Sequence, residues 1–160
     1  MITKEKGAIT FGYKIDDLFN DVGLISSYMT KDIKNEDGSM IDEFAISDDE
    51  RELFDVCVKQ AAPNIFEAML KMSTCTDGYG IENGEIRFSV KDFNAYNENV
   101  LPLVDSTIYD CLKFGVLTEF YSMNIHPDLR KISNDKYSDV LLLLNQRLFQ
   151  LKRRSVSSLY

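Results

Sequence analysis

The sequence predicts a mainly α-helical fold: a bundle-like domain of four or more helices, with one β-hairpin inserted between the second and third helices and an extended C-terminal tail. Apolar residues recur at three- and four-residue spacing over four long stretches, which is typical of helices that face a core. Between the second and third stretches the period changes to two around an Asn-Gly pair, which indicates a hairpin. The length of 160 residues and the hydrophobic content of 44% favour one folded domain. We therefore expect a single helical domain with an N-terminal arm over residues 1–151, and a basic tail over residues 152–160.

The chain begins with an alternating segment, residues 7–14, in which Ile9, Phe11 and Tyr13 share one side. Alternation of this kind is typical of a short strand or of an extended arm laid on another surface. An arm of this composition is suited to adding a strand to a neighbouring molecule. Ile9, Phe11 and Tyr13 are therefore predicted to contact a partner.

The first two helices are marked by their starts and by their spacing. Helical spacing over residues 15–31 predicts the first helix, with two aspartates in its first turn where negative charge suits the helix dipole. Ser47 and Glu50 form a capping-box pattern that predicts the start of the second helix. Pro63 interrupts the second apolar pattern, so either one kinked helix or two short helices fit it.

Residues 76–90 predict the hairpin. Asn83-Gly84 suits a type I′ turn, because both central residues of that turn need positive φ. A lone hairpin is only marginally stable in water, so we expect it to lie on the helices or to pair with another chain. The alternating apolar residues beside the turn are Tyr79, Ile81, Ile86, Phe88 and Val90.

The third helix is predicted over residues 97–123, with Pro102 tolerated near its start. It carries two apolar stripes, so it is either a central core helix or a helix shared between the core and an interface. One stripe contains Leu101, Val104, Ile108, Cys111 and Leu112, and the other contains Val100, Leu103, Thr107, Phe114, Leu117 and Tyr121.

The fourth helix is predicted from Pro127 to about Arg154, with a break near Ser133 as an alternative. A heptad-spaced stripe of Tyr137, Leu141, Leu144, Leu148 and Leu151 suits packing on one core. Further apolar residues lie outside that stripe, which indicates a second face covered by a protein partner. The predicted partner contacts in this region are Leu142, Leu143, Phe149, Lys152, Arg153, Arg154, Leu159 and Tyr160.

Charge is distributed unevenly along the chain. The net charge is −8, and the four charged residues after Asp139 are all basic, so the residues up to Asp139 carry −12. An acidic body argues against nucleic-acid binding as the main task, because phosphate contacts need clustered Lys and Arg. The basic tail suits an acidic patch on a partner subunit at least as well as it suits nucleic acid.

The sequence gives no sign of membrane insertion or of a disulfide framework. The longest apolar run, residues 140–144, is too short to span a bilayer, and the first residues lead into no apolar segment of a secretory signal. Cys57, Cys75 and Cys111 are odd in number and lack metal-site spacing, and we expect Cys57 and Cys111 to pack as small hydrophobes. We expect a cytoplasmic protein, or a particle assembled in the cytoplasm.

No motif predicts catalysis, a cofactor or a metal site. His126 is the only histidine and adjoins Pro127, which favours a loop or helix-cap role. The acidic loop over residues 32–44 fails as a calcium loop, because placing Gly38 sixth puts Ile33 first and Phe44 twelfth. Nucleotide-binding and hydrolase signatures are also lacking. We expect a protein that is not an enzyme and that needs no cofactor.

Several segments resemble the small virion proteins of tailed phages and prophages of Bacteroides-type hosts. In that group a long helix is followed by a short loop with Pro and Asp, and then by a helix with a Tyr and the ending LNxRLxxLKRR. The corresponding segments here are residues 103–121, Pro127-Asp128, Tyr137 and residues 144–154, with residues 48–54, residues 64–66 and the Asn-Gly hairpin in the same order upstream.

The resemblance implies a head–tail connector, or neck ring protein. Such a protein is a helical subunit that forms a homo-oligomeric ring, commonly of twelve copies, beneath the portal protein. It seals the head after packaging and gives the tail its docking surface, and DNA passes through it without specific binding. The implied location is the neck of the virion, the implied partners are portal, tail and other neck proteins, and the family has no catalytic residues.

Other functions fit part of the same evidence. Another virion role, such as tail completion, is the nearest alternative. From a different class, a cytoplasmic regulatory module that binds a protein partner also uses two apolar faces and an acidic surface. An enzyme is the weakest class, because nothing in the sequence selects a catalytic pair of carboxylates.

Overall fold

The computed structural model describes residues 1–5, 8–31, 45–72, 76–91 and 97–152. These residues form a mainly helical protein with four helices and a small four-stranded antiparallel sheet. The predicted fold class is therefore confirmed at the level of a mainly helical domain, and the sheet is larger than the predicted single hairpin. In chain order the elements are β1 (Ile2–Glu5), β2 (Ala8–Lys14), α1 (Ile15–Thr30), a 3-10 turn (Asp48–Glu50), α2 (Arg51–Met72), β3 (Thr76–Glu82), β4 (Glu85–Lys91), a second 3-10 turn (Glu98–Val100), α3 (Leu101–Met123) and α4 (Pro127–Lys152).

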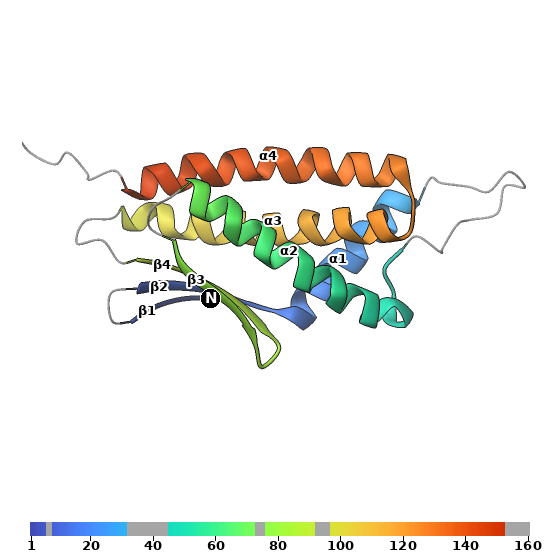
Figure 1. Ribbon diagram of the computed structural model, residues 1–160, viewed down its shortest axis with the longest axis horizontal. Coiled ribbons are helices and arrows are strands. Elements are labelled where there is room, and N and C mark those ends of the chain that lie inside the picture. Colours follow the sequence, from blue (N-terminus) through green and yellow to red (C-terminus); the bar gives the residue numbers. More distant parts are fainter. Residues whose placement is uncertain (6–7, 32–44, 73–75, 92–96, 153–160) are drawn as a thin grey trace, which may run out of the picture.

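Helix α3 is the central helix of the fold. It runs beside α4, with α2 crossing in front of α3 and the sheet at the opposite edge from α4 (Figure 1). It also packs against α2 and α1. Cys111, Leu112, Val116 and Leu117 point in different directions around its axis, and all four are fully buried. Of the two alternatives for the third helix, the structure therefore supports the central core helix.

The sheet has the strand order β1-β2-β4-β3, and every neighbouring pair is antiparallel. Strand β2 is paired on both edges, with β1 on one side and β4 on the other. The predicted hairpin β3–β4 thus pairs with another segment of its own chain. Its turn forms as predicted, with Asn83 at φ 52° and Gly84 at φ 74°.

The expected N-terminal arm is an interior strand. Ile9 and Phe11 are fully buried and Tyr13 is nearly so, because their side of β2 continues the apolar side of β4, where Phe11 lies opposite Phe88. The prediction that Ile9, Phe11 and Tyr13 contact a partner is therefore wrong, since these side chains fill the core of their own chain.

Most of the helix limits follow the sequence signals. Helix α1 ends at Thr30, and the Glu50 carboxylate accepts a hydrogen bond of 2.8 Å from the Ser47 backbone N–H, as the capping box predicts. Helix α2 is one helix that runs through Pro63. Helix α4 is likewise continuous through Ser133, so the alternative with a break there is wrong.

Candidate interaction surfaces

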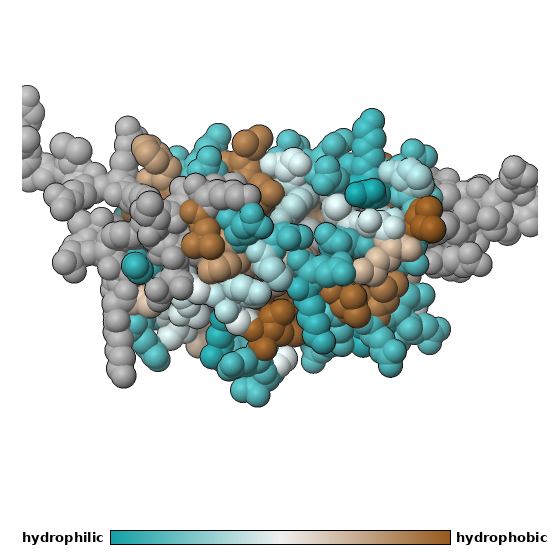
Figure 2. Space-filling model, in the orientation of Figure 1, coloured by the Kyte–Doolittle hydropathy of each residue, from teal (hydrophilic) through white to brown (hydrophobic). Residues whose placement is uncertain are grey.

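Helix α4 has one buried side and one exposed side. Leu144, Leu148 and Leu151 are buried at heptad spacing on the side that faces α3. Leu142 and Phe149 lie on the opposite side and are 63% and 66% exposed. They share one face, because seven residues bring a helix nearly back to the same direction. Figure 2 shows apolar side chains in separate patches between hydrophilic ones, including along the edge formed by α4. We call Leu142 and Phe149 the α4 outer pair.

Polar contacts fix the rotation of α4 against α3. The Arg147 guanidinium donates a hydrogen bond of 2.8 Å to the backbone oxygen of Leu103 and a second one to the Thr107 hydroxyl. At the other end, the backbone N–H of His126 donates a hydrogen bond of 3.1 Å to the backbone oxygen of Tyr121 at the end of α3. His126 Nδ1 also accepts a hydrogen bond of 3.2 Å from the backbone N–H of Leu129, which confirms the helix-cap alternative for His126. Because α4 is held against α3 at both ends, the α4 outer pair points away from the core.

A second exposed apolar pair lies on α1. Leu18, Phe19 and Val22 are buried on the inner side of this helix, whereas Leu24 and Tyr28 are 60% and 69% exposed. Leu24 and Tyr28 are four residues apart and therefore lie on one face. We call them the α1 outer pair. The first helix, like the fourth, holds more apolar residues than one stripe needs. That pattern predicts that some of them are exposed, but it does not identify which ones.

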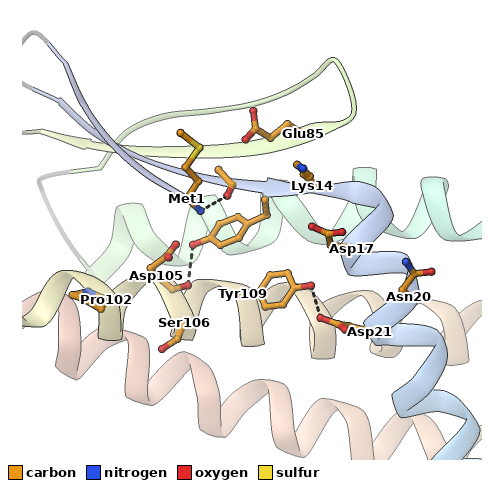
Figure 3. Close-up of a pocket in the computed structure, with 12 residues that line it drawn as sticks. Met1, Lys14, Asp17, Asn20, Asp21, Glu85, Pro102, Asp105, Ser106 and Tyr109 are labelled. Carbon is orange, nitrogen blue, oxygen red and sulfur yellow. Dashed lines mark hydrogen bonds between the residues drawn. The ribbon is translucent and has the colours of Figure 1, made fainter.

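An open pocket of about 640 Å³ lies between the start of α1, the end of β2 and the first turns of α3 (Figure 3). The Tyr13 hydroxyl donates a hydrogen bond of 2.9 Å to the backbone oxygen of Asp105, and the Tyr109 hydroxyl donates one of 2.6 Å to the Asp21 carboxylate. The two tyrosine rings stack with their centroids 5.5 Å apart. Asp17 adds a further carboxylate to the wall. The two hydrogen bonds therefore link β2 to α3 and α3 to α1.

Two phenols at this pocket and two thiols in the core are held in their neutral forms. Burial is the main reason that the pKa values of Tyr13 and Tyr109 lie above the usual range, and the nearby Asp105 and Asp21 add to the effect. Burial also raises the pKa of the Cys57 and Cys111 thiols to about 12. A neutral phenol or thiol is a poor base or nucleophile. These four groups therefore act as packing and hydrogen-bonding groups.

The structure places the predicted site residues in three groups. Leu142, Leu143 and Phe149 are exposed on α4, although Leu143 lies on its flank and is the least exposed of the three. Ile9, Phe11 and Tyr13 are in the core, as described above. Lys152 is the last residue of α4. The remaining tail residues, Arg153, Arg154, Leu159 and Tyr160, lie outside the described residues, as do Cys75 and the acidic loop over residues 32–44.

Metal binding and membrane insertion find no support in the described part of the chain. Within the described parts of the chain, no group of three or more His, Cys, Asp or Glu side chains is arranged to hold a metal ion. No helix in these same segments is both long enough and apolar enough to cross a membrane.

Comparison with known proteins gives no relative. No family model matches the chain, and neither the curated proteins nor the solved structures contain a match to it. The resemblance to phage connector proteins therefore depends on the sequence segments quoted above. It enters the functional conclusion as a proposal.

Proposed function

We propose that this chain is a non-catalytic structural subunit of a protein assembly, and specifically a head–tail connector subunit of a tailed phage. The observation that carries the proposal is the α4 outer pair. Leu142 and Phe149 are large apolar side chains on the face of α4 that is turned away from its own core. Clustered exposed apolar residues of this kind are typical of a surface that a protein partner covers.

The expected gain from covering this face is large enough to support assembly. Fully covering a Leu or Phe side chain contributes about 1.5–3 kcal/mol per residue. Helix α4 presents the pair on a rigid element that is held by Arg147 and by its inner leucines, so little conformational freedom is lost on docking. The proposed partners are further copies of the chain in a ring, the portal protein above it and the tail proteins below it.

The charge distribution supports the same role. The residues up to Asp139 carry −12, so an acidic wall repels DNA phosphates and lets DNA slide past without being held. In the sequence, basic residues 152–154 follow Leu151 directly. They suit an acidic patch on the portal or on a neighbouring subunit.

An enzymatic role receives no comparable support. The buried thiols of Cys57 and Cys111 have pKa values near 12, and the phenols of the pocket in Figure 3 donate hydrogen bonds within the fold. None of these groups has the lowered pKa that an activated nucleophile requires.

The test is a cryo-EM reconstruction of the native particle, or of the purified chain mixed with a candidate portal protein. We expect a ring of this chain between the portal and the tail, with the α4 outer pair covered by a neighbour. Absence of the chain from the particle would contradict the connector role. A cytoplasmic regulatory module that binds a protein through the same face would then be the better explanation.

A further inference from the structure

The described part of the chain exposes two different apolar pairs on two different helices. The α1 outer pair is Leu24 and Tyr28, and the α4 outer pair is Leu142 and Phe149. Helix α3 packs against both α1 and α4 and lies between them, while each pair remains more than half exposed. Among the described residues, no element covers either pair, and both are therefore available to another molecule.

The charges around the α1 outer pair form an ordered stripe. Asp17, Leu24 and Lys31 are spaced by seven residues and lie on one face with Tyr28. Asp17 and Lys31 are exposed, and none of the ion pairs formed between described side chains uses either of them. Read from the N-terminal end, this face is acidic, then apolar, then basic.

The face of α4 has the complementary order when it is read in the opposite direction. Asp139 is exposed three residues before Leu142, on the side of the pair that leads towards the start of α4. From the C-terminal end of α4 backwards, the described order is therefore apolar and then acidic.

Antiparallel docking of the two faces brings their apolar residues together and places a pair of opposite charges side by side. With Tyr28 beside Leu142, Lys31 lies beside Asp139, because each charge is three residues beyond its apolar neighbour. Leu24 then inserts between Leu142 and Phe149, one helical turn along. The apolar residues are thus flanked by one pair of opposite charges, Lys31 and Asp139.

We infer that the partner of each apolar face is a second copy of this chain, with α1 of one copy docked antiparallel on the outer face of α4 of the next. This inference depends on the proposed role as an assembly subunit and names the contact through which copies associate. The contact is head-to-tail, since it joins two different faces that α3 separates within each copy, and successive copies extend into a ring or a filament. A two-fold contact of α4 on α4 would leave the α1 outer pair exposed, whereas the head-to-tail contact covers both pairs.

The test uses two full-length variants, each with one face blocked by a charge. Tyr28→Arg blocks the α1 face, and Leu142→Arg blocks the α4 face. Both side chains are exposed, so neither change is expected to disturb the fold, which circular dichroism checks. Val56→Arg is the matched control, because Val56 is an exposed apolar residue on α2 that belongs to neither face. Sedimentation velocity and native mass spectrometry give the size and composition of the species.

We expect the wild type and the Val56→Arg control to self-associate beyond a dimer, and each blocked variant alone to be monomeric. Mixing the two blocked variants should produce a one-to-one heterodimer that grows no further. That complex joins the intact α1 face of Leu142→Arg to the intact α4 face of Tyr28→Arg.

Three results would overturn the inference. Dimers of Tyr28→Arg alone would show that α4 pairs with α4, and dimers of Leu142→Arg alone would show that α1 pairs with α1. A wild type that stays monomeric at high concentration, together with no complex in the mixture, would show that the chain does not bind itself through these faces. This last result leaves the connector role to be judged separately, by the presence or absence of the chain in the particle reconstruction.

Discussion

Helices α3 and α4 are of similar length, 23 and 26 residues, and each holds more apolar residues than one stripe requires. In α3 the additional apolar side chains are buried, because α4, α2 and α1 cover the helix from several sides. In α4 the excess remains on the surface, since α3 covers only the side with Leu144, Leu148 and Leu151. The same sequence property therefore has two meanings, which the position of the helix in the fold decides. Only the exposed apolar residues are available for an interaction with a partner.

The largest expected effect is on the central helix. Phe120→Ala in α3 removes a fully buried ring that packs against Tyr121, with ring centroids 5.4 Å apart. We expect the free energy of unfolding to fall by about 3–5 kcal/mol, because a cavity replaces the ring. Urea denaturation followed by circular dichroism measures this loss. An effect below about 1 kcal/mol would contradict the central position of α3.

The two sides of α4 give the most direct comparison. Leu144→Ala on the inner side should lower the free energy of unfolding by about 2–5 kcal/mol, because that leucine is fully buried. Leu142→Ala on the outer side should change it by less than about 0.5 kcal/mol, since the side chain stays in water in the monomer. The two variants make the same chemical change two residues apart. Equal losses in urea titrations of dilute monomer would refute the assignment of inner and outer sides.

A smaller effect is expected where α3 meets α4 and α2 most closely. A Cβ atom at Gly115 would lie 3.3 Å from Cε2 of Tyr137 in α4 and 3.5 Å from Cβ of Ala61 in α2. Gly115→Val therefore overpacks the contact, and we expect a loss of about 1–3 kcal/mol despite the better helix propensity of valine over glycine. Thermal unfolding measures the loss. Gly115→Ala is the control and should be milder, because its single methyl group sits at the edge of ordinary contact distance.

The sequence predicts local features better than long-range ones. The capping box of Ser47 and Glu50 and the turn at Asn83-Gly84 depend on a few adjacent residues, and both form as predicted. Strand β1 was missed because its pairing with β2 is not visible in four residues of which two are charged. That missing strand is also why β2 was interpreted as an arm: once β1 and β4 pair with it, no free edge remains for a partner.

The candidate surfaces show the same limit. Leu142 and Phe149 were predicted to lie outside the core because the heptad leucines of the fourth helix define its inner side. No such regular stripe singles out Leu24 and Tyr28 on the first helix, so their exposure depends on which side of α1 meets α3. Whether a partner covers either pair stays a prediction, which the paired-variant experiment tests.

The smallest expected effect on stability concerns the hydrogen bond between α3 and α1, and it depends on pH. The Tyr109 hydroxyl donates to Asp21 at 2.6 Å, and removing it in Tyr109→Phe should cost about 0.5–1.5 kcal/mol at neutral pH, because Asp21 remains accessible to water. Burial and the adjacent carboxylate raise the pKa of Tyr109 above its ordinary value of 10.0. The folded state therefore holds this proton more tightly than the unfolded state, so the contribution is complete below pH 10.0 and is lost as the pH rises above that value.

Urea titrations from neutral to alkaline pH should show that the stability difference between wild type and Tyr109→Phe shrinks above pH 10.0. Tyrosinate absorbance is the independent readout of ionisation. The other buried phenols, Tyr13, Tyr121 and Tyr137, also have raised pKa values, so both proteins should lose stability in this range. A difference that stays constant with pH would contradict this prediction. It would show that ionisation of Tyr109 does not weaken the contact between α3 and α1.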